Sequence, residues 1–190
     1  MIAYLIGVDG GGTGTRVRIA DRSGTLLAQG SAGPSALGQG VEAAWEHILS
    51  AIQAAFHSVG QSTPSWSECA MGAGLSGISN LPRRDRFLVM NPGFARIALE
   101  SDAYTALLAA HGGRPGAMVA SGTGSVGEVL YANGTRKQVL IGFRFALGFC
   151  SRSRLGNRFG LRLGDLLLHV FEILKRLKFH KPMLPQAKAL

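Results

Sequence analysis

A short glycine-rich segment near the start of the chain has the composition of a phosphate-binding loop. It consists of Asp9, Gly10, Gly11, Gly12, Thr13, Gly14 and Thr15. Glycines leave backbone N–H groups open to phosphate oxygens because no Cβ stands in the way, and the two threonine hydroxyls add donors. The Asp9 carboxylate cannot itself favour phosphate, but beside phosphate such a group commonly holds Mg²⁺, directly or through water. A plain hairpin turn is the alternative, although a hairpin seldom needs three consecutive glycines.

A second loop with the same chemistry follows later in the chain. It consists of Ser121, Gly122, Thr123, Gly124 and Ser125. The spacing Gly122-x-Gly124-x-x-Gly127 also matches the dinucleotide-binding fingerprint, which requires a helix directly after the loop. Residues 128–131 favour a strand instead, so the sequence predicts no Rossmann site. The chain contains no Gly-Lys pair, which excludes a Walker A loop.

A carboxylate lies between the two loops in the sequence, where a predicted strand meets a predicted helix. Asp102, in the segment Glu100-Ser101-Asp102-Ala103, would occupy the N-cap or the first turn of this helix. One interpretation is a capping carboxylate. The other is a catalytic base that accepts the proton of an attacking hydroxyl, as in phosphotransferases. The residues alone leave both interpretations open.

The elements predicted around these loops are strands and helices in the order expected of an α/β protein. Strands are predicted at residues 2–9, 15–21, 25–31, 68–73, 95–99, 117–120, 126–132 and 138–143. Helices are predicted at residues 41–59, 83–90 and 102–110. The first three strands form an antiparallel meander whose first turn is the first glycine loop. Strand, small-residue loop and strand occur at 2–21 and again at 117–132, and this weak repeat favours a protein of two lobes.

Five segments, taken together and in order, resemble the BadF/BadG/BcrA/BcrD-type ATPase family, which also includes N-acetylglucosamine and glucosamine kinases. The segments are VDGGGTGTRVRIAD, AGPSALGQG, GLSG, ESDAYTAL and VASGTGSVGEV. The resemblance covers the chain to about residue 148. It implies an α/β fold of the actin-like, ribonuclease-H-like type, with one complete lobe at 1–112, the start of a second lobe at 113–148 and a divergent tail at 149–190.

The resemblance also implies a role for each segment. Asp9 to Thr15 would be the first phosphate loop, with Asp9 near the metal, and Ser121 to Ser125 would be the second. Asp102 would be the base that activates a sugar hydroxyl. The sugar would be lined by Gly33, Pro34, Ser35, Ala36, Leu75, Ser76 and Gly77. N-acetylglucosamine kinases of this family often carry Asn where this chain has Ala36, so a free amino sugar is the expected substrate.

The function implied is ATP-dependent phosphorylation of an amino sugar, glucosamine or N-acetylglucosamine, with ATP and Mg²⁺ as cofactors, in the cytoplasm. The kinase branch fits better than the reductase-activating ATPases, because those hold an iron–sulfur cluster with cysteines and Cys69 and Cys150 are isolated. Two alternatives stay open: an ATPase that activates a partner enzyme, and a non-enzymatic remnant or sugar-binding lobe.

The net charge of +9 is concentrated in the tail. Residues 1–148 carry 11 basic and 9 acidic residues, whereas residues 149–190 carry 9 and 2. The tail also departs from the family pattern, so we expect a truncated or frameshifted product with little or no turnover of its own. Its charge lacks the aromatic or amphipathic context of nucleic-acid or membrane binding, so neither partner is expected. Apolar surface left by an incomplete second lobe would favour aggregation or a homodimer.

Overall fold

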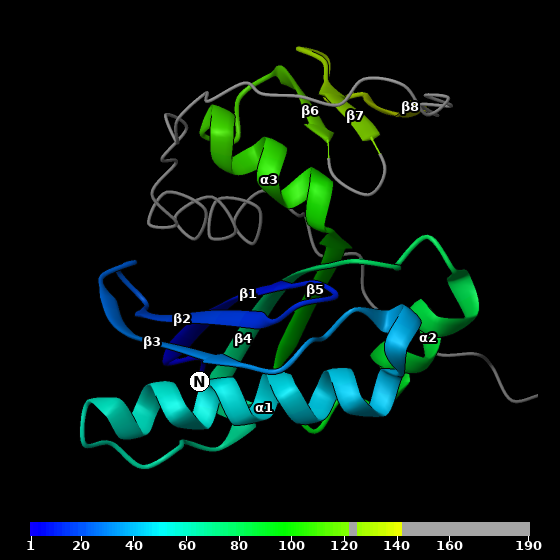
Figure 1. Cartoon of the computed structure of the whole chain (residues 1–190). Coiled ribbons are helices and arrows are strands. Elements are labelled where there is room, and N and C mark those ends of the chain that lie inside the picture. The colour runs from blue at the N-terminus through cyan, green and yellow to red at the C-terminus, as the bar shows by residue number, and fades with distance from the viewer. Residues whose placement is uncertain (122–124, 142–190) are drawn as a thin grey trace, which may run out of the picture.

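A computed structural model of the chain describes residues 1–121 and 125–141, which form two sheets and three α-helices (Figure 1). The first sheet contains β1 (Tyr4–Gly10), β2 (Thr15–Asp21), β3 (Leu26–Ala32), β4 (Cys69–Leu75) and β5 (Arg96–Ser101). The second contains β6 (Gly116–Ser121), β7 (Ser125–Leu130) and β8 (Arg136–Ile141). The helices are α1 (Val41–Ser58), α2 (Leu81–Val89) and α3 (Asp102–His111), with short 3₁₀ turns η1 (Leu37–Gln39) and η2 (Trp66–Glu68).

Every strand and helix predicted within the described residues is present, with ends that differ by no more than two residues. The tail predicted at 149–190 lies outside the described residues, as does the end of the last predicted strand. The two short 3₁₀ turns were not predicted. Among the helices that the structure describes, none is both long enough and apolar enough to cross a membrane.

The five-stranded sheet has the order β3-β2-β1-β4-β5. β1, β2 and β3 pair antiparallel, which confirms the predicted meander, and β4 and β5 run parallel to β1. Parallel pairing requires long connections, and α1 and α2 supply them. As a result β1, β4 and β5 end at the same edge of the sheet, where Gly10 pairs with Leu75 and Leu75 with Ser101.

Helix α1 covers one face of this sheet and forms the main core with it (Figure 1). Alternate strand residues point at the helix, so Ile6, Val8, Val17 and Ile19 are buried. Trp45 on α1 is buried and stacked on Phe87 of α2 at 4.2 Å between ring centroids. Its indole N–H donates to the Phe87 carbonyl oxygen at 3.0 Å.

The second sheet contains antiparallel strands in the order β6-β7-β8. A strand, not a helix, follows the second small-residue loop, which confirms that the fingerprint-like spacing there is not a Rossmann site. A hairpin turn at Asn133-Gly134 joins β7 to β8, with Gly134 at a φ of 82°. Helix α3 packs against β6 and β7 and also contacts β4 (Figure 1). It therefore connects the two sheets physically as well as along the chain.

Close packing of α1 on β3 depends on Gly30. A Cβ at this position would collide with the backbone oxygen of Ala51 and lie 2.9 Å from the backbone nitrogen of Ala55. Both are backbone atoms of the helix, so the helix itself would have to shift. We expect Gly30→Ala to lower the free energy of unfolding by about 1–3 kcal/mol, measured by urea denaturation. Gly11→Ala is the matched control, because no atom lies within 4 Å of the added methyl; equal stability of the two variants would contradict the packing argument.

Candidate active site

The carboxyl ends of β1, β4 and β5 bring three of the predicted site segments to one edge of the sheet. The glycine loop follows β1, Ser76 and Gly77 follow β4, and Asp102 follows β5. Backbone hydrogen bonds join these segments: Ser76 N–H donates to the Gly10 carbonyl at 3.0 Å, and Leu37 N–H donates to the Ser76 carbonyl at 3.0 Å. Ligands of open α/β sheets commonly bind at such an edge.

The glycine loop is the connection between β1 and β2, closed by the pairing of Gly10 with Thr15. Within it, Gly11 N–H donates to the Gly14 carbonyl at 3.1 Å. Gly10 is required by space, since a Cβ would collide with the Ser35 hydroxyl and lie 2.6 Å from a methyl of Leu75. No glycine of this loop has a positive φ. The turn conformation therefore does not explain why the other three positions are glycine.

The outer side of the loop is open. No atom lies within 4 Å of a Cβ built on Gly11, and the nearest atoms to Gly12 and Gly14 lie 3.5 Å away. Neither strain nor internal packing thus demands glycine at these three positions. A ligand that approaches the backbone would demand it, because a methyl group would stand between the N–H groups and the ligand. This pattern fits a phosphate-binding loop better than a plain hairpin.

The two threonines of the loop have different environments. Thr13 is exposed, whereas Thr15 is 1% exposed. The Thr15 hydroxyl donates to the Gly33 carbonyl at 2.6 Å and lies 2.7 Å from the Ser35 hydroxyl. The expectation that both hydroxyls face phosphate is therefore corrected for Thr15, whose side chain ties the loop to the segment after β3.

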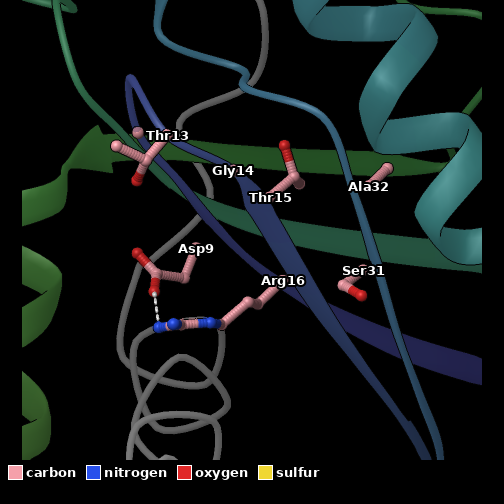
Figure 2. Close-up of a pocket in the computed structure, with 8 residues that line it drawn as sticks. Asp9, Thr13, Gly14, Thr15, Arg16, Ser31 and Ala32 are labelled. Carbon is pink, nitrogen blue, oxygen red and sulfur yellow. Dashed lines mark ion pairs between the residues drawn. The ribbon is translucent and has the colours of Figure 1, made fainter.

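A hollow of about 290 Å³ lies beside the loop on the face of the sheet away from α1 (Figure 2). Its lining residues are Asp9, Gly11, Thr13, Gly14, Thr15, Arg16, Ser31 and Ala32. Asp9, Arg16 and Ser31 are direct partners across β1, β2 and β3. In Figure 2 the Arg16 guanidinium points toward the Asp9 carboxylate, at 3.9 Å. The hollow thus offers backbone N–H groups, a hydroxyl, a cation and a carboxylate to one ligand.

The pKa of Asp9 is raised above its ordinary value. Burial is the largest cause, the nearby Arg16 opposes it, and the negative charge of Asp102 adds to it. Asp102 is therefore close enough to Asp9 for its charge to affect the pKa of Asp9. The described residues contain no cluster of three or more His, Cys, Asp or Glu side chains that could hold a metal. One or two carboxylates completed by phosphate oxygens and water are, however, the usual environment of Mg²⁺ beside a nucleotide, and these residues fit it.

Asp102 is the first residue of α3, and the structure tests the capping interpretation of its carboxylate. Ser101 is the N-cap, because its hydroxyl accepts a hydrogen bond from Tyr104 N–H at 3.1 Å. Asp102 is exposed, with one oxygen accepting from Ala103 N–H at 2.8 Å. The cap is thus supplied by the neighbouring residue, and the Asp102 carboxylate faces solvent at the sheet edge beside the glycine loop.

The segment predicted to line a sugar is fixed firmly against the glycine loop. Ser35 and Ala36 both donate their backbone N–H groups to the Gly11 carbonyl, at 3.1 and 3.2 Å. Their side chains are buried, 0% and 8% exposed. The Ser35 hydroxyl is used internally by Thr15, so a sugar would meet the exposed Gly77 and half-buried Ser76 more readily than these two side chains.

Of the second small-residue loop, the structure describes only the two end residues. Ser121 and Ser125 form the last pair of β6 and β7. Gly122, Thr123 and Gly124, which were predicted to bind phosphate, lie outside the described residues. The loop is therefore placed between two antiparallel strands, as predicted, and its role stays a prediction.

One group of charged residues at the site was missed in the sequence. Arg136 at the start of β8 bonds to Glu100 at the end of β5 and to Glu128 on β7, and also reaches the cap residue Ser101. Glu128 is completely buried. A carboxylate in the apolar strand sequence VGEVL was the available signal, because a buried charge needs a partner.

Asp9 offers a direct test of this electrostatic arrangement. Its carboxyl should titrate above the ordinary value of an aspartate, as followed by NMR of its side-chain carbon across pH. We expect Asp102→Asn to lower this pKa, because it removes a like charge, and Arg16→Gln to raise it further, because it removes an opposite charge. An Asp9 pKa unmoved by both substitutions would contradict the proximity of the three groups.

Known proteins resemble this chain over its described part. Residues 6–148 match the BadF/BadG/BcrA/BcrD ATPase family. Glucosamine kinase GspK of Vibrio cholerae serotype O1 is 34% identical over 160 residues, which are 84% of this chain and 53% of that protein. The chain thus spans about half the length of this curated relative.

A solved structure is similar to this chain in its fold as well as in its sequence. A candidate N-acetylglucosamine kinase from Chromobacterium violaceum is 51% identical, with a TM-score of 0.70 over 72% of this chain and 48% of that one. The expected actin-like α/β fold is thereby confirmed for the part that is shared. The match over three quarters of the sequence, together with this fold, establishes that the chain belongs to the BadF/BadG/BcrA/BcrD ATPase family.

Proposed function

We propose that this protein catalyses ATP-dependent phosphorylation of an amino sugar, with glucosamine as the preferred substrate. The observation that carries the proposal is the meeting of an open glycine loop and an exposed carboxylate, Asp102, at one edge of the sheet. The Vibrio cholerae relative is named for glucosamine and the Chromobacterium violaceum relative for N-acetylglucosamine, so the two names support an amino sugar as substrate. An enzyme that consumes ATP would work in the cytoplasm, where ATP is made available.

The glycine loop would bind the nucleotide phosphates. Backbone N–H groups of residues 12–14 and the exposed Thr13 hydroxyl are the donors, and Arg16 adds a positive charge. Asp9 would hold Mg²⁺, which neutralises phosphate charge when it is bound. Burial raises the pKa of Asp9 and favours the neutral acid. A bound cation would oppose this effect, because it stabilises the ionised carboxylate.

Asp102 would act on the sugar. Its carboxylate would accept a hydrogen bond from the attacking hydroxyl, orient it toward the terminal phosphate and receive its proton. Phosphoryl transfer depends mainly on such positioning and on charge neutralisation, so few side chains are needed. Ser76 and Gly77, at the end of β4, would lie along the sugar.

The alanine at position 36 favours a sugar with a free amino group over a sugar with an acetamido group. This residue is buried under the glycine loop and offers no polar side chain to an acetamido group. The second small-residue loop, Ser121 to Ser125, would also bind the nucleotide phosphates. Glucosamine is therefore proposed ahead of N-acetylglucosamine, and a titration with both sugars compares them.

The open loop predicts a separation of binding from stability. Gly11→Ala and Gly12→Ala should weaken binding of Mg·ATP more than tenfold, about 1.4 kcal/mol, because the new methyl group stands over the N–H donors. Both should unfold like the native chain, since the methyl has space within the protein. Isothermal titration calorimetry measures the first effect and a thermal melt the second; ATP binding unchanged in both variants would remove the loop from the site.

The role of Asp102 predicts a loss of chemistry without a loss of nucleotide binding. Because this chain is expected to turn over little or not at all, the test uses a longer chain that carries the whole second lobe. There Asp102→Asn should reduce glucosamine-dependent ADP formation by about 10²- to 10⁴-fold, the usual contribution of a general base. Binding of ATP should change little, and so should the fold, because Ser101 remains as the cap. Glu46→Gln, an exposed carboxylate on α1, is the matched control and should behave like the native chain.

Three outcomes of that assay would be informative. Sugar-dependent turnover that survives in Asp102→Asn would remove Asp102 as the base. ATP hydrolysis that is indifferent to every amino sugar would contradict the kinase proposal and favour a partner-activating ATPase. Binding of sugar without any ATP binding would leave only a sugar-binding lobe.

A further inference from the structure

An ionic cluster with a buried carboxylate at its centre joins the second sheet to the first, and nothing in the proposed chemistry uses it. At its centre Glu128 of β7 is 0% exposed. Its carboxylate accepts hydrogen bonds from Gln138 at 2.7 Å and from two nitrogens of Arg136 at 3.3 and 3.4 Å. A buried carboxylate is costly unless it is paired in this way. Arg136 is therefore held on one side by a fixed charge inside the second sheet.

On its other side Arg136 reaches the end of β5. Its Nη1 donates to Glu100 at 2.6 Å, and its Nη2 donates to the hydroxyl of Ser101 at 3.0 Å. The guanidinium also lies 3.8 Å above the centre of the Tyr104 ring on α3. One side chain from β8 thus contacts the last two residues of β5 and the first turn of α3, across 35 positions of sequence from Ser101.

The contact with Ser101 is the important one, because Ser101 caps α3. Its hydroxyl accepts from Tyr104 N–H while it is held by Arg136. Asp102 is the next residue, so the direction of its carboxylate depends on how the first turn of the helix begins. We propose that Arg136 is a positioning residue: through Ser101 it fixes the Asp102 carboxylate toward the substrate, a role that rests on the proposed function.

The geometry requires arginine at this position. A guanidinium presents a rigid planar set of N–H donors, and here they are divided among Glu128, Glu100 and Ser101 while the flat face lies on Tyr104. Lysine carries the same charge on a single nitrogen and cannot meet all of these contacts at once. Arg136→Lys should therefore recover only part of the function.

The experiment separates positioning from stability by removing the Arg136–Glu128 pair in two steps. Arg136→Met leaves the buried Glu128 without its cationic partner and with Gln138 as its remaining donor, so it should lower the melting temperature. The double substitution Glu128→Met with Arg136→Met removes both charges and should restore the melting temperature. Lys137→Met, which removes a positive charge from the neighbouring exposed position on β8, is the matched control.

Two readouts are then compared on the full chain. Amide exchange at Tyr104 N–H reports the cap, and titration with glucosamine and with Mg·ATP reports the two ligands separately. In the stable double variant we expect exchange at Tyr104 at least tenfold faster, glucosamine binding at least fivefold weaker and ATP binding unchanged. Arg136→Lys should lie between the double variant and the native chain.

Each result decides the matter. If the double variant recovers native exchange at Tyr104 and native sugar affinity along with its stability, Arg136 is merely structural and the proposal fails. If the native chain binds no amino sugar, the proposed function fails, while the exchange rate at Tyr104 still decides whether Arg136 fixes the first turn of α3. Equal weakening of sugar and ATP binding would also overturn the proposal, because it would indicate a general loosening of the site.

Discussion

The site depends on the close approach of three chain segments around Gly10. With no side chain there, the Ser35 hydroxyl and the Leu75 side chain lie against the backbone where β1 ends. Ser76 N–H completes the contact by donating to the Gly10 carbonyl at 3.0 Å. The glycine loop, the end of β4 and the segment after β3 are consequently held as one unit, before any ligand binds. Pre-organised backbone donors of this kind lose little entropy when they bind a phosphate.

The two carboxylates at this edge, Asp9 and Asp102, have different environments. Asp9 lies within the hollow, half-removed from water, where burial and the charge of Asp102 raise its pKa. Asp102 is the first residue of α3 and is exposed, and Ser101 is the residue that caps the helix. Two carboxylates with different environments can serve a metal and a proton, respectively, which is the division of labour that phosphoryl transfer to a hydroxyl requires.

Much of this arrangement could be predicted from the sequence, because its signals are local. Hydrophobic alternation and helical spacing predicted the strands and helices in their correct order. The parallel pairing that brings Gly10 and Asp102 to one edge was not predicted and comes from the structure. The burial of Thr15 could not be predicted, since it depends on Gly33 and Ser35 arriving from another strand. The choice between Ser101 and Asp102 as the cap was equally hidden, because both residue types cap helices well. The contact of Arg136 with Glu100 joins two sheets, and it could not be predicted because the two residues are 36 positions apart in the sequence.

The central claim is that the glycine loop and Asp102 act on the two substrates of one reaction. A crystal structure of this chain with glucosamine, Mg²⁺ and a non-hydrolysable ATP analogue measures this most directly. The account predicts phosphate oxygens within hydrogen-bond distance of the backbone N–H groups of residues 12–14, and a sugar hydroxyl on the Asp102 carboxylate. A nucleotide bound away from the loop, or a sugar whose hydroxyls do not reach Asp102, would contradict it.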